Sequence, residues 1–192
     1  MACPPYHGPV SDQPPPRRLV RHELVTSGGR ALYVYGALRG EPRDPSEGSE
    51  VGDDRALHRR LDRLSGTWVA VSPSRNVRPH SRVDVVCPLC PGGAELAFGY
   101  EAAVFENRFP SLVASPPPAG PDPRRAPSVG RCEVVLYTEH HEGSLATLSP
   151  EELANVIGIW RDRTAALWAD RRHRVVMPFE NRGEAVGATL SH

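Results

Sequence analysis

The sequence contains no lysine, and its 23 basic residues, all arginine, are balanced by 23 acidic residues. A net charge of zero argues against non-specific binding to nucleic acid or to an anionic membrane, although a local basic cluster is compatible with it. No apolar run approaches the ~20 residues of a membrane span. The first 20 residues are proline-rich and lack an apolar segment, so we expect no secretory signal and a cytoplasmic protein.

Apolar residues are also scarce, at 39%, because 21 prolines and 17 glycines occupy much of the 192-residue chain. This length fits one domain, or one domain with tails. The proline- and glycine-rich composition of residues 1–54 predicts an amino-terminal tail that holds only a short strand near 30–36. Residues 55–192 are then expected to form the domain.

Short runs of β-forming residues between glycine and proline turns predict six strands. They are expected at residues 30–35, 67–72, 82–86, 102–105, 133–138 and 174–179. A single long amphipathic helix is expected from Pro150 to about Asp170, because Ser149, Pro150 and Glu152 form a capping-box sequence and apolar residues follow at helical spacing. Strands in series with one long helix indicate an α+β fold with a mainly antiparallel sheet.

The sharpest local motif is Cys-Pro-Leu-Cys at residues 87–90. Two thiolates separated by two residues can share one tetrahedral Zn²⁺ from a tight turn. A redox Cys-x-x-Cys, which needs its first thiol at a helix N-terminus, is less compatible with the Pro-Gly-Gly that follows at once, and two unrelated thiols remain an alternative. Further ligands could come from His141, with His140 as its competitor, or from His192.

Three short segments have side chains suited to a phosphorylated ligand. Arg75 and Arg78 follow a predicted strand, and two guanidinium groups three residues apart can face one phosphate, although a solvated arginine-rich loop is the simpler reading. Asn181 also follows a predicted strand and could hydrogen-bond a base or ribose. Phe105 and Phe109 surround an amide at Asn107, an arrangement that suits a nucleobase but equally suits an ordinary core.

In their order, these motifs resemble the galactose-1-phosphate uridylyltransferase family, a branch of the histidine-triad superfamily. The matching segments are 58–60, 64–69, 72–79, 87–90, 104–110, 137–141, 179–183 and 187–192. The resemblance covers about residues 55–192 and implies an α+β half-barrel of antiparallel strands. It also implies an enzyme of galactose use that transfers UMP between UDP-glucose or UDP-galactose and hexose 1-phosphates through a covalent histidine intermediate, and that forms a homodimer.

The same resemblance assigns roles to individual residues. It implies a zinc site whose ligands are Cys87, Cys90, His141 and His192. It also implies a substrate site, with the two arginines on the phosphates and the other residues around the uridine: Arg75, Arg78, Leu89, Phe105, Asn107, Arg108, Asn181, Gly187 and Thr189. At position 108 the family commonly has an acidic residue, so a ribose contact by Arg108 is a departure from its pattern.

The sequence departs from the family most clearly at the catalytic motif. The family pattern continues as His-Pro-His-x-Gln, in which the second histidine is the nucleophile, whereas this sequence stops at the first, His192. We therefore expect a truncated amino-terminal domain that is inactive alone, with no catalytic residue of its own. The alternatives are a non-catalytic, zinc-structured nucleotide-binding module and a related nucleotide phosphorylase.

Overall fold

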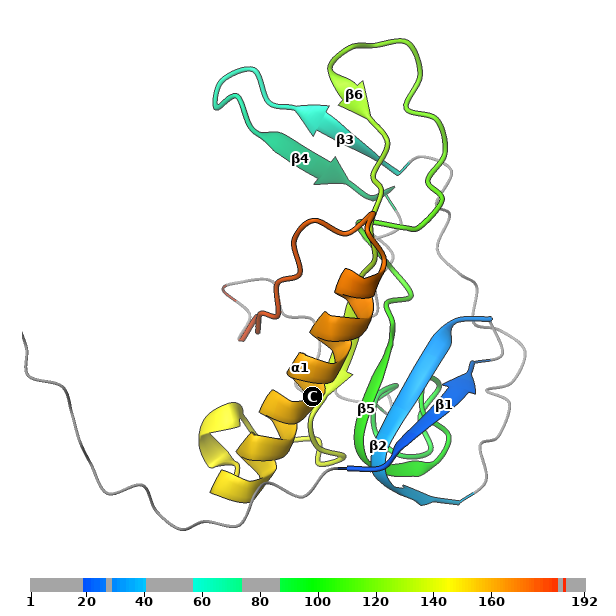
Figure 1. Cartoon of the computed structure of the whole chain (residues 1–192), viewed down its shortest axis with the longest axis vertical. Coiled ribbons are helices and arrows are strands. Elements are labelled where there is room, and N and C mark those ends of the chain that lie inside the picture. The colour runs from blue at the N-terminus through cyan, green and yellow to red at the C-terminus, as the bar shows by residue number, and fades with distance from the viewer. Residues whose placement is uncertain (1–18, 27–28, 41–56, 74–86, 183–184, 186–192) are drawn as a thin grey trace, which may run out of the picture.

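The computed structural model describes residues 19–26, 29–40, 57–73, 87–182 and 185 (Figure 1). The seven strands in this part of the chain are β1 (Arg21–Val25), β2 (Ala31–Arg39), β3 (His58–Leu61), β4 (Trp68–Val71), β5 (Gly99–Glu106), β6 (Arg125–Ala126) and β7 (Glu133–Leu136). A 3-10 turn, η3 (Leu145–Thr147), precedes the long helix α1 (Pro150–Ala169).

The main sheet has the strand order β1-β2-β5-β7, and every neighbouring pair is antiparallel. Its register places Val34 opposite Ala103 and Phe105 opposite Val134. Because side chains alternate along a strand, the two long central strands, β2 and β5, supply apolar residues to both faces of the sheet.

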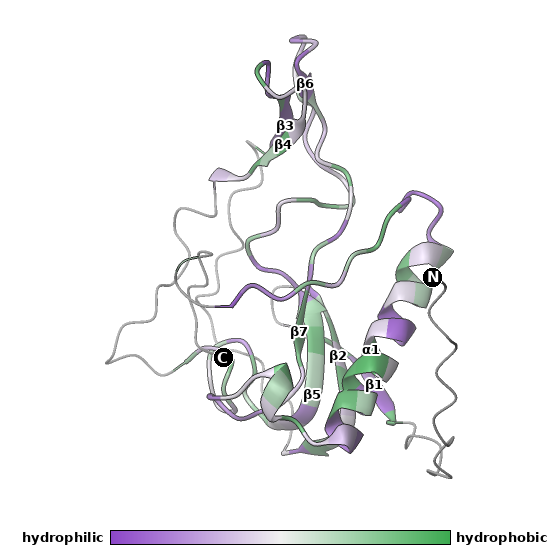
Figure 2. Ribbon diagram, turned by 90° about the vertical axis from the view of Figure 1, so that its left-hand side faces the viewer, coloured by the Kyte–Doolittle hydropathy of each residue, from purple (hydrophilic) through white to green (hydrophobic). Residues whose placement is uncertain are grey.

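The two faces of the main sheet are covered differently. One face carries the larger core cluster, in which Val34, Leu96 and Tyr100 are fully buried and to which the segment around Cys87 adds Leu89. On the opposite face, Ile159 of α1 packs against Tyr35, Ala102 and Val104 (Figures 1 and 2). The Cys-x-x-Cys segment and the helix therefore contact opposite sides of one sheet.

The start of helix α1 matches the sequence prediction. The side chain of Ser149 accepts a hydrogen bond from the Glu152 N–H at 3.2 Å, and the Glu152 carboxylate accepts one from the Ser149 N–H at 2.7 Å, with Pro150 at the first helical position. These bonds satisfy backbone donors that have no partner within the helix.

The face that α1 turns toward the sheet differs from the apolar stripe that helical spacing predicts, which consists of Leu153, Val156, Ile157, Trp160, Leu167 and Trp168. Val156, Ile159 and Arg163 are buried, whereas Leu153, Ile157 and Trp168 of the stripe are exposed. The orientation is set partly by charge, since Arg163 donates two hydrogen bonds, of 2.9 and 3.0 Å, to the buried carboxylate of Glu133 on β7.

The second sheet, of strand order β4-β3-β6, lies apart from the main sheet in both views (Figures 1 and 2). Its strands are short, and Arg59 on β3 lies over the half-exposed ring of Trp68 on β4. Both sheets are open, and neither closes into a barrel within the described residues. The predicted α+β fold with mainly antiparallel strands is confirmed.

Four of the predicted strands are confirmed: residues 30–35 in β2, 67–72 in β4, 102–105 in β5 and 133–138 in β7. The strand predicted at 82–86 lies outside the described residues. The strand predicted at 174–179 is wrong, because that segment pairs with no other strand in the described part of the chain and leaves Val175, Met177 and Phe179 exposed. High β-propensity does not make a strand without a neighbouring backbone to pair with.

The sequence reasoning missed β1, β3 and β6. Strand β1 begins at Arg21, within the predicted tail, and β6 lies at the end of the proline-rich stretch 116–127, for which the composition predicts an extended surface segment. The domain boundary near residue 55 stays a prediction. No helix in the described residues has the length and apolar character needed to cross a membrane.

Candidate functional site

The two cysteines of the 87–90 motif lie in a tight turn that is closed by backbone hydrogen bonds. The Cys90 N–H donates to the Cys87 carbonyl at 3.2 Å, and the Gly93 N–H donates to the Cys90 carbonyl at 2.8 Å. No helix begins after Cys90, as the Pro-Gly-Gly sequence predicts. The thiols therefore lack the helix N-terminus that a redox Cys-x-x-Cys uses to lower its pKa.

Glycine at position 93 is required by the close approach of the turn to itself. A Cβ atom there would lie 2.5 Å from the Cys87 carbonyl oxygen and 2.7 Å from the Pro88 carbonyl oxygen. The neighbouring Gly92 has a φ of +83°, in the left-handed region that side chains disfavour. The Pro-Gly-Gly sequence is thus a structural requirement of the turn that presents both thiols.

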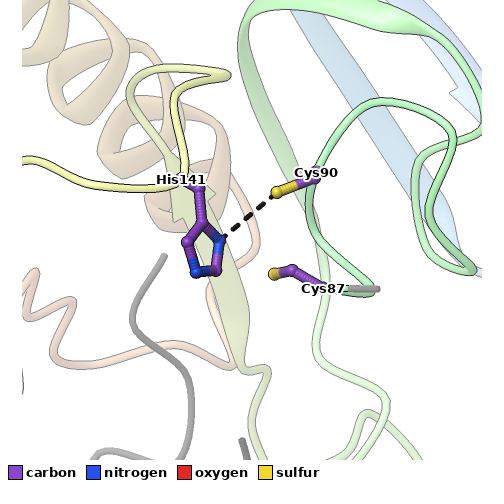
Figure 3. Close-up of side chains that lie close together, drawn as sticks. All are labelled: Cys87, Cys90 and His141. Atoms are coloured by element: carbon purple, nitrogen blue, oxygen red, sulfur yellow. Dashed lines mark hydrogen bonds between the residues drawn. The ribbon is translucent and has the colours of Figure 1, made fainter. Parts of the chain in front are cut away.

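The third member of the site comes from a segment distant in sequence, just after β7. The Nδ1 atom of His141 lies 3.4 Å from the Sγ atom of Cys90 (Figure 3). One ligand atom each from Cys87, Cys90 and His141 lie within 4.8 Å of one another. His140 does not join this group, so the geometry distinguishes between the two adjacent histidines that the sequence left as competitors.

The electrostatics of the site favour a bound cation. Burial raises the pKa of the Cys90 thiol, and the hydrogen bond and charge of Cys87 raise it further. Two thiolates side by side repel each other, and a divalent cation between them removes the repulsion and keeps both deprotonated. Two sulfur donors and one imidazole nitrogen make up three of the four ligands of a tetrahedral zinc site, so these residues fit a zinc ion.

A small cavity of about 30 Å³ adjoins the histidines. Its lining residues are Val135, Leu136, Tyr137, Thr138, His140, His141 and Gly143. This volume holds about one water molecule. Among the described residues the cavity marks open space beside His141.

The segment that carries Asn181 lies beside the histidine segment. The hydroxyl group of Tyr137 donates to the Glu180 carboxylate at 3.0 Å, and Arg182 donates to the Gly143 carbonyl at 3.0 Å. Burial raises the pKa of Tyr137, and the Glu180 carboxylate raises it further. Asn181 itself is exposed between these two anchored neighbours.

The other predicted substrate residues in the described part of the chain are mostly engaged within the protein. Leu89 and Phe105 are buried in the larger core cluster. The Asn107 side chain accepts a hydrogen bond from the Phe109 N–H at 2.9 Å. Arg108 lies over the Phe109 ring. Their contacts with a nucleotide stay a prediction.

Five of the predicted site residues lie outside the described residues: Arg75, Arg78, Gly187, Thr189 and His192. Sequence reasoning missed three residues around the cysteine turn: Arg30, its partner Glu95, and Tyr100, whose hydroxyl donates to the Leu89 carbonyl at 2.8 Å. The only signal for them is that a glutamate precedes Leu96 and Phe98 in an otherwise apolar stretch. The partner of that glutamate, Arg30, is 65 residues away along the chain, beyond any local pattern.

The fold is similar to that of solved uridylyltransferase structures. Two solved structures of a uridylyltransferase, one of them a mutant, superimpose with TM-scores of 0.53 and 0.54 at 24% and 22% identity. Each covers 70% of this chain, which in turn spans 43% and 42% of the two structures. Because the identities are low, this likeness shows the fold alone.

Sequence comparison defines the family. Residues 49–192 match the family model of the galactose-1-phosphate uridyl transferase N-terminal domain. The galactose-1-phosphate uridylyltransferase of Thermotoga maritima is 39% identical over 138 residues, which are 69% of this chain and 43% of that protein. That of Streptomyces lividans is 44% identical over 109 residues, 55% of this chain and 27% of that protein. The chain belongs to the galactose-1-phosphate uridylyltransferase family, and it spans less than half the length of these two relatives.

Proposed function

We propose that this chain forms the sugar-nucleotide-binding part of a UDP-glucose–hexose-1-phosphate uridylyltransferase. In this reaction UMP moves between a UDP-sugar and a hexose 1-phosphate through a covalent histidine intermediate. The observation that carries the proposal is the convergence of Cys87, Cys90 and His141 beside the anchored Asn181 segment, in a chain of this family.

The metal in this proposal is a Zn²⁺ ion held by Cys87, Cys90, His141 and His192. The first three are close enough to share one ion. When bound, the ion supplies a rigid cross-link between the cysteine turn and the segment after β7. A reducing, cytoplasmic environment would keep both thiols reduced and able to bind the metal.

The substrate residues of the proposal fall into two groups. Arg75 and Arg78 would bind the phosphates, since guanidinium groups form charge-assisted, bidentate hydrogen bonds with phosphate oxygens. The remaining ones would surround the uridine: Leu89, Phe105, Asn107, Arg108, Asn181, Gly187 and Thr189. We also propose that the protein forms a homodimer, as its resemblance to the family implies.

The test is isothermal titration calorimetry of the chain with UDP-glucose. The sequence holds no His-Pro-His triplet, so binding rather than turnover is the property of this chain that tests the proposal. The Asn181→Ala variant is expected to bind up to about tenfold more weakly, because one hydrogen bond contributes ~0.5–1.5 kcal/mol. Asn155→Ala, the same change on α1, is the control and should bind as the wild type does. Absence of binding by the wild-type chain, or equal binding by Asn181→Ala, would contradict the assignment of nucleotide binding to this site.

A further inference from the structure

We propose that Glu95 is a positioning residue for the metal centre: its buried carboxylate fixes the Cys87–Cys90 turn to the main sheet in the geometry that the metal needs. This inference rests on the proposed zinc site and deepens it. Glu95 lies five residues beyond Cys90 and is not itself a ligand in the described group.

The first observation is a buried ion pair beside the turn. Arg30, immediately before β2, donates a hydrogen bond of 2.6 Å to the Glu95 carboxylate, and the two side chains are only 10% and 8% exposed. Arg30 also donates to the Glu106 carbonyl at the end of β5, at 2.9 Å. Through Arg30, the Glu95 carboxylate is therefore tied to the two central strands of the main sheet.

A second arginine approaches the same carboxylate from the segment after β5. Arg108 lies 3.7 Å from the second oxygen of Glu95. A carboxylate between two guanidinium groups is held in direction as well as in distance, because each oxygen faces its own cation. Arg108 is also one of the predicted substrate residues. Glu95 therefore contacts the cysteine turn through its backbone and the segment after β5 through its carboxylate.

The second observation links Glu95 to the thiols through the backbone. The Glu95 N–H donates to the Pro88 carbonyl at 2.9 Å, and Pro88 lies between the two cysteines. The next residue, Leu96, accepts from the Gly92 N–H at 2.9 Å and is fully buried in the core. Any shift of the Glu95 main chain therefore moves the peptide that separates Cys87 from Cys90.

Energetics indicate that this pair serves geometry more than stability. A buried ion pair contributes little net stability, because removal of both charges from water offsets their attraction. The pair does favour one arrangement of the two segments, because any arrangement that separates the two charges leaves each of them buried without a partner and destabilises the fold. Groups that orient metal ligands from outside the ligand set commonly change metal affinity by ten- to a hundredfold when replaced.

The experiment compares the zinc affinity of three full-length chains by competition with a chromophoric chelator. Glu95→Gln keeps the size of the side chain and removes its charge. Glu133→Gln is the matched control: Glu133 is also buried, 6% exposed, and also pairs with a buried arginine, Arg163, but on the helix side of the sheet. We expect Glu95→Gln to weaken zinc binding about tenfold or more and Glu133→Gln to leave it unchanged. Thermal unfolding of both variants measures the structural cost separately.

The outcomes separate this inference from the site on which it rests. A wild-type chain that binds no zinc contradicts the metal site itself. If the wild type binds zinc and Glu95→Gln binds it equally well, or if both variants lose affinity in proportion to their lost stability, the positioning role is wrong. Should Glu95→Gln fail to fold, Glu95→Asp decides: it keeps the charge but shortens the reach to Arg30, so a loss of zinc affinity supports the role and wild-type affinity overturns it.

Discussion

Replacement of Gly93 by alanine is the sharpest probe of the cysteine turn. The new Cβ atom would lie 2.5, 2.7 and 2.8 Å from three backbone atoms, whereas ordinary contacts begin at 3.4 Å. The turn must therefore open by about 0.9 Å at the Cys87 carbonyl, the difference between 3.4 and 2.5 Å. Metal–ligand distances tolerate only about 0.2 Å. We expect Gly93→Ala to lose most of its zinc affinity and ~1–3 kcal/mol of stability through overpacking.

The assay for Gly93→Ala combines chelator competition for zinc with thermal unfolding of the metal-free chain. Gly158→Ala is the matched control, because a Cβ atom at that helical position meets nothing within 4 Å. It should bind zinc normally and gain about 0.5–1 kcal/mol of stability from its higher helix propensity. Wild-type zinc affinity in Gly93→Ala would refute the argument that this turn sets the positions of the two thiols.

Further predictions concern the contact between α1 and the sheet. Ile159→Ala should lower the free energy of unfolding by about 2–5 kcal/mol in urea denaturation, because Ile159 is buried against the sheet; a loss below 1 kcal/mol would contradict that packing. Arg163→Met, which removes two of the three hydrogen bonds to the buried Glu133 carboxylate and leaves the one from Arg131 at 2.8 Å, should cost about 1–3 kcal/mol in the same assay. Burial acts to raise the pKa of Asp162, but hydrogen bonds from Tyr35 and Arg21 outweigh it and hold that pKa below its usual 3.8. The stability from Asp162 is therefore present above about pH 4 and lost as the pH falls through the lowered value, so Asp162→Asn should show a shallower acid-induced fall in unfolding temperature than the wild type; equal slopes would contradict this.

The elements that the sequence predicted correctly are those with local signals. Ser149 and Glu152 start α1 where their capping box requires, and the runs that became β2, β4, β5 and β7 are bounded by glycine or proline. The segment 174–179 is also rich in β-forming residues, although it contains Pro178, and it pairs with no other strand in the described part of the chain. Pairing depends on what lies alongside a strand, which composition does not encode.

The candidate site shows the same division between local and distant information. The spacing of Cys87 and Cys90 predicted their proximity, and the following Pro-Gly-Gly predicted the absence of a helix. The choice of His141 over His140 depends on how the segment after β7 packs, and the role of Glu95 depends on Arg30, which is 65 residues away. Neither follows from spacing along the chain.

The most direct test of the central claim, a metal held by two cysteines and His141, is a Co²⁺ titration followed by absorption spectroscopy. The account predicts one cobalt per chain with a near-ultraviolet sulfur-to-cobalt charge-transfer band. That band should weaken strongly in Cys90→Ser and remain in the control Cys132→Ser, whose thiol lies outside the described ligand group. A wild-type chain that shows no charge-transfer band, or a band of equal strength in Cys90→Ser, would contradict the claim.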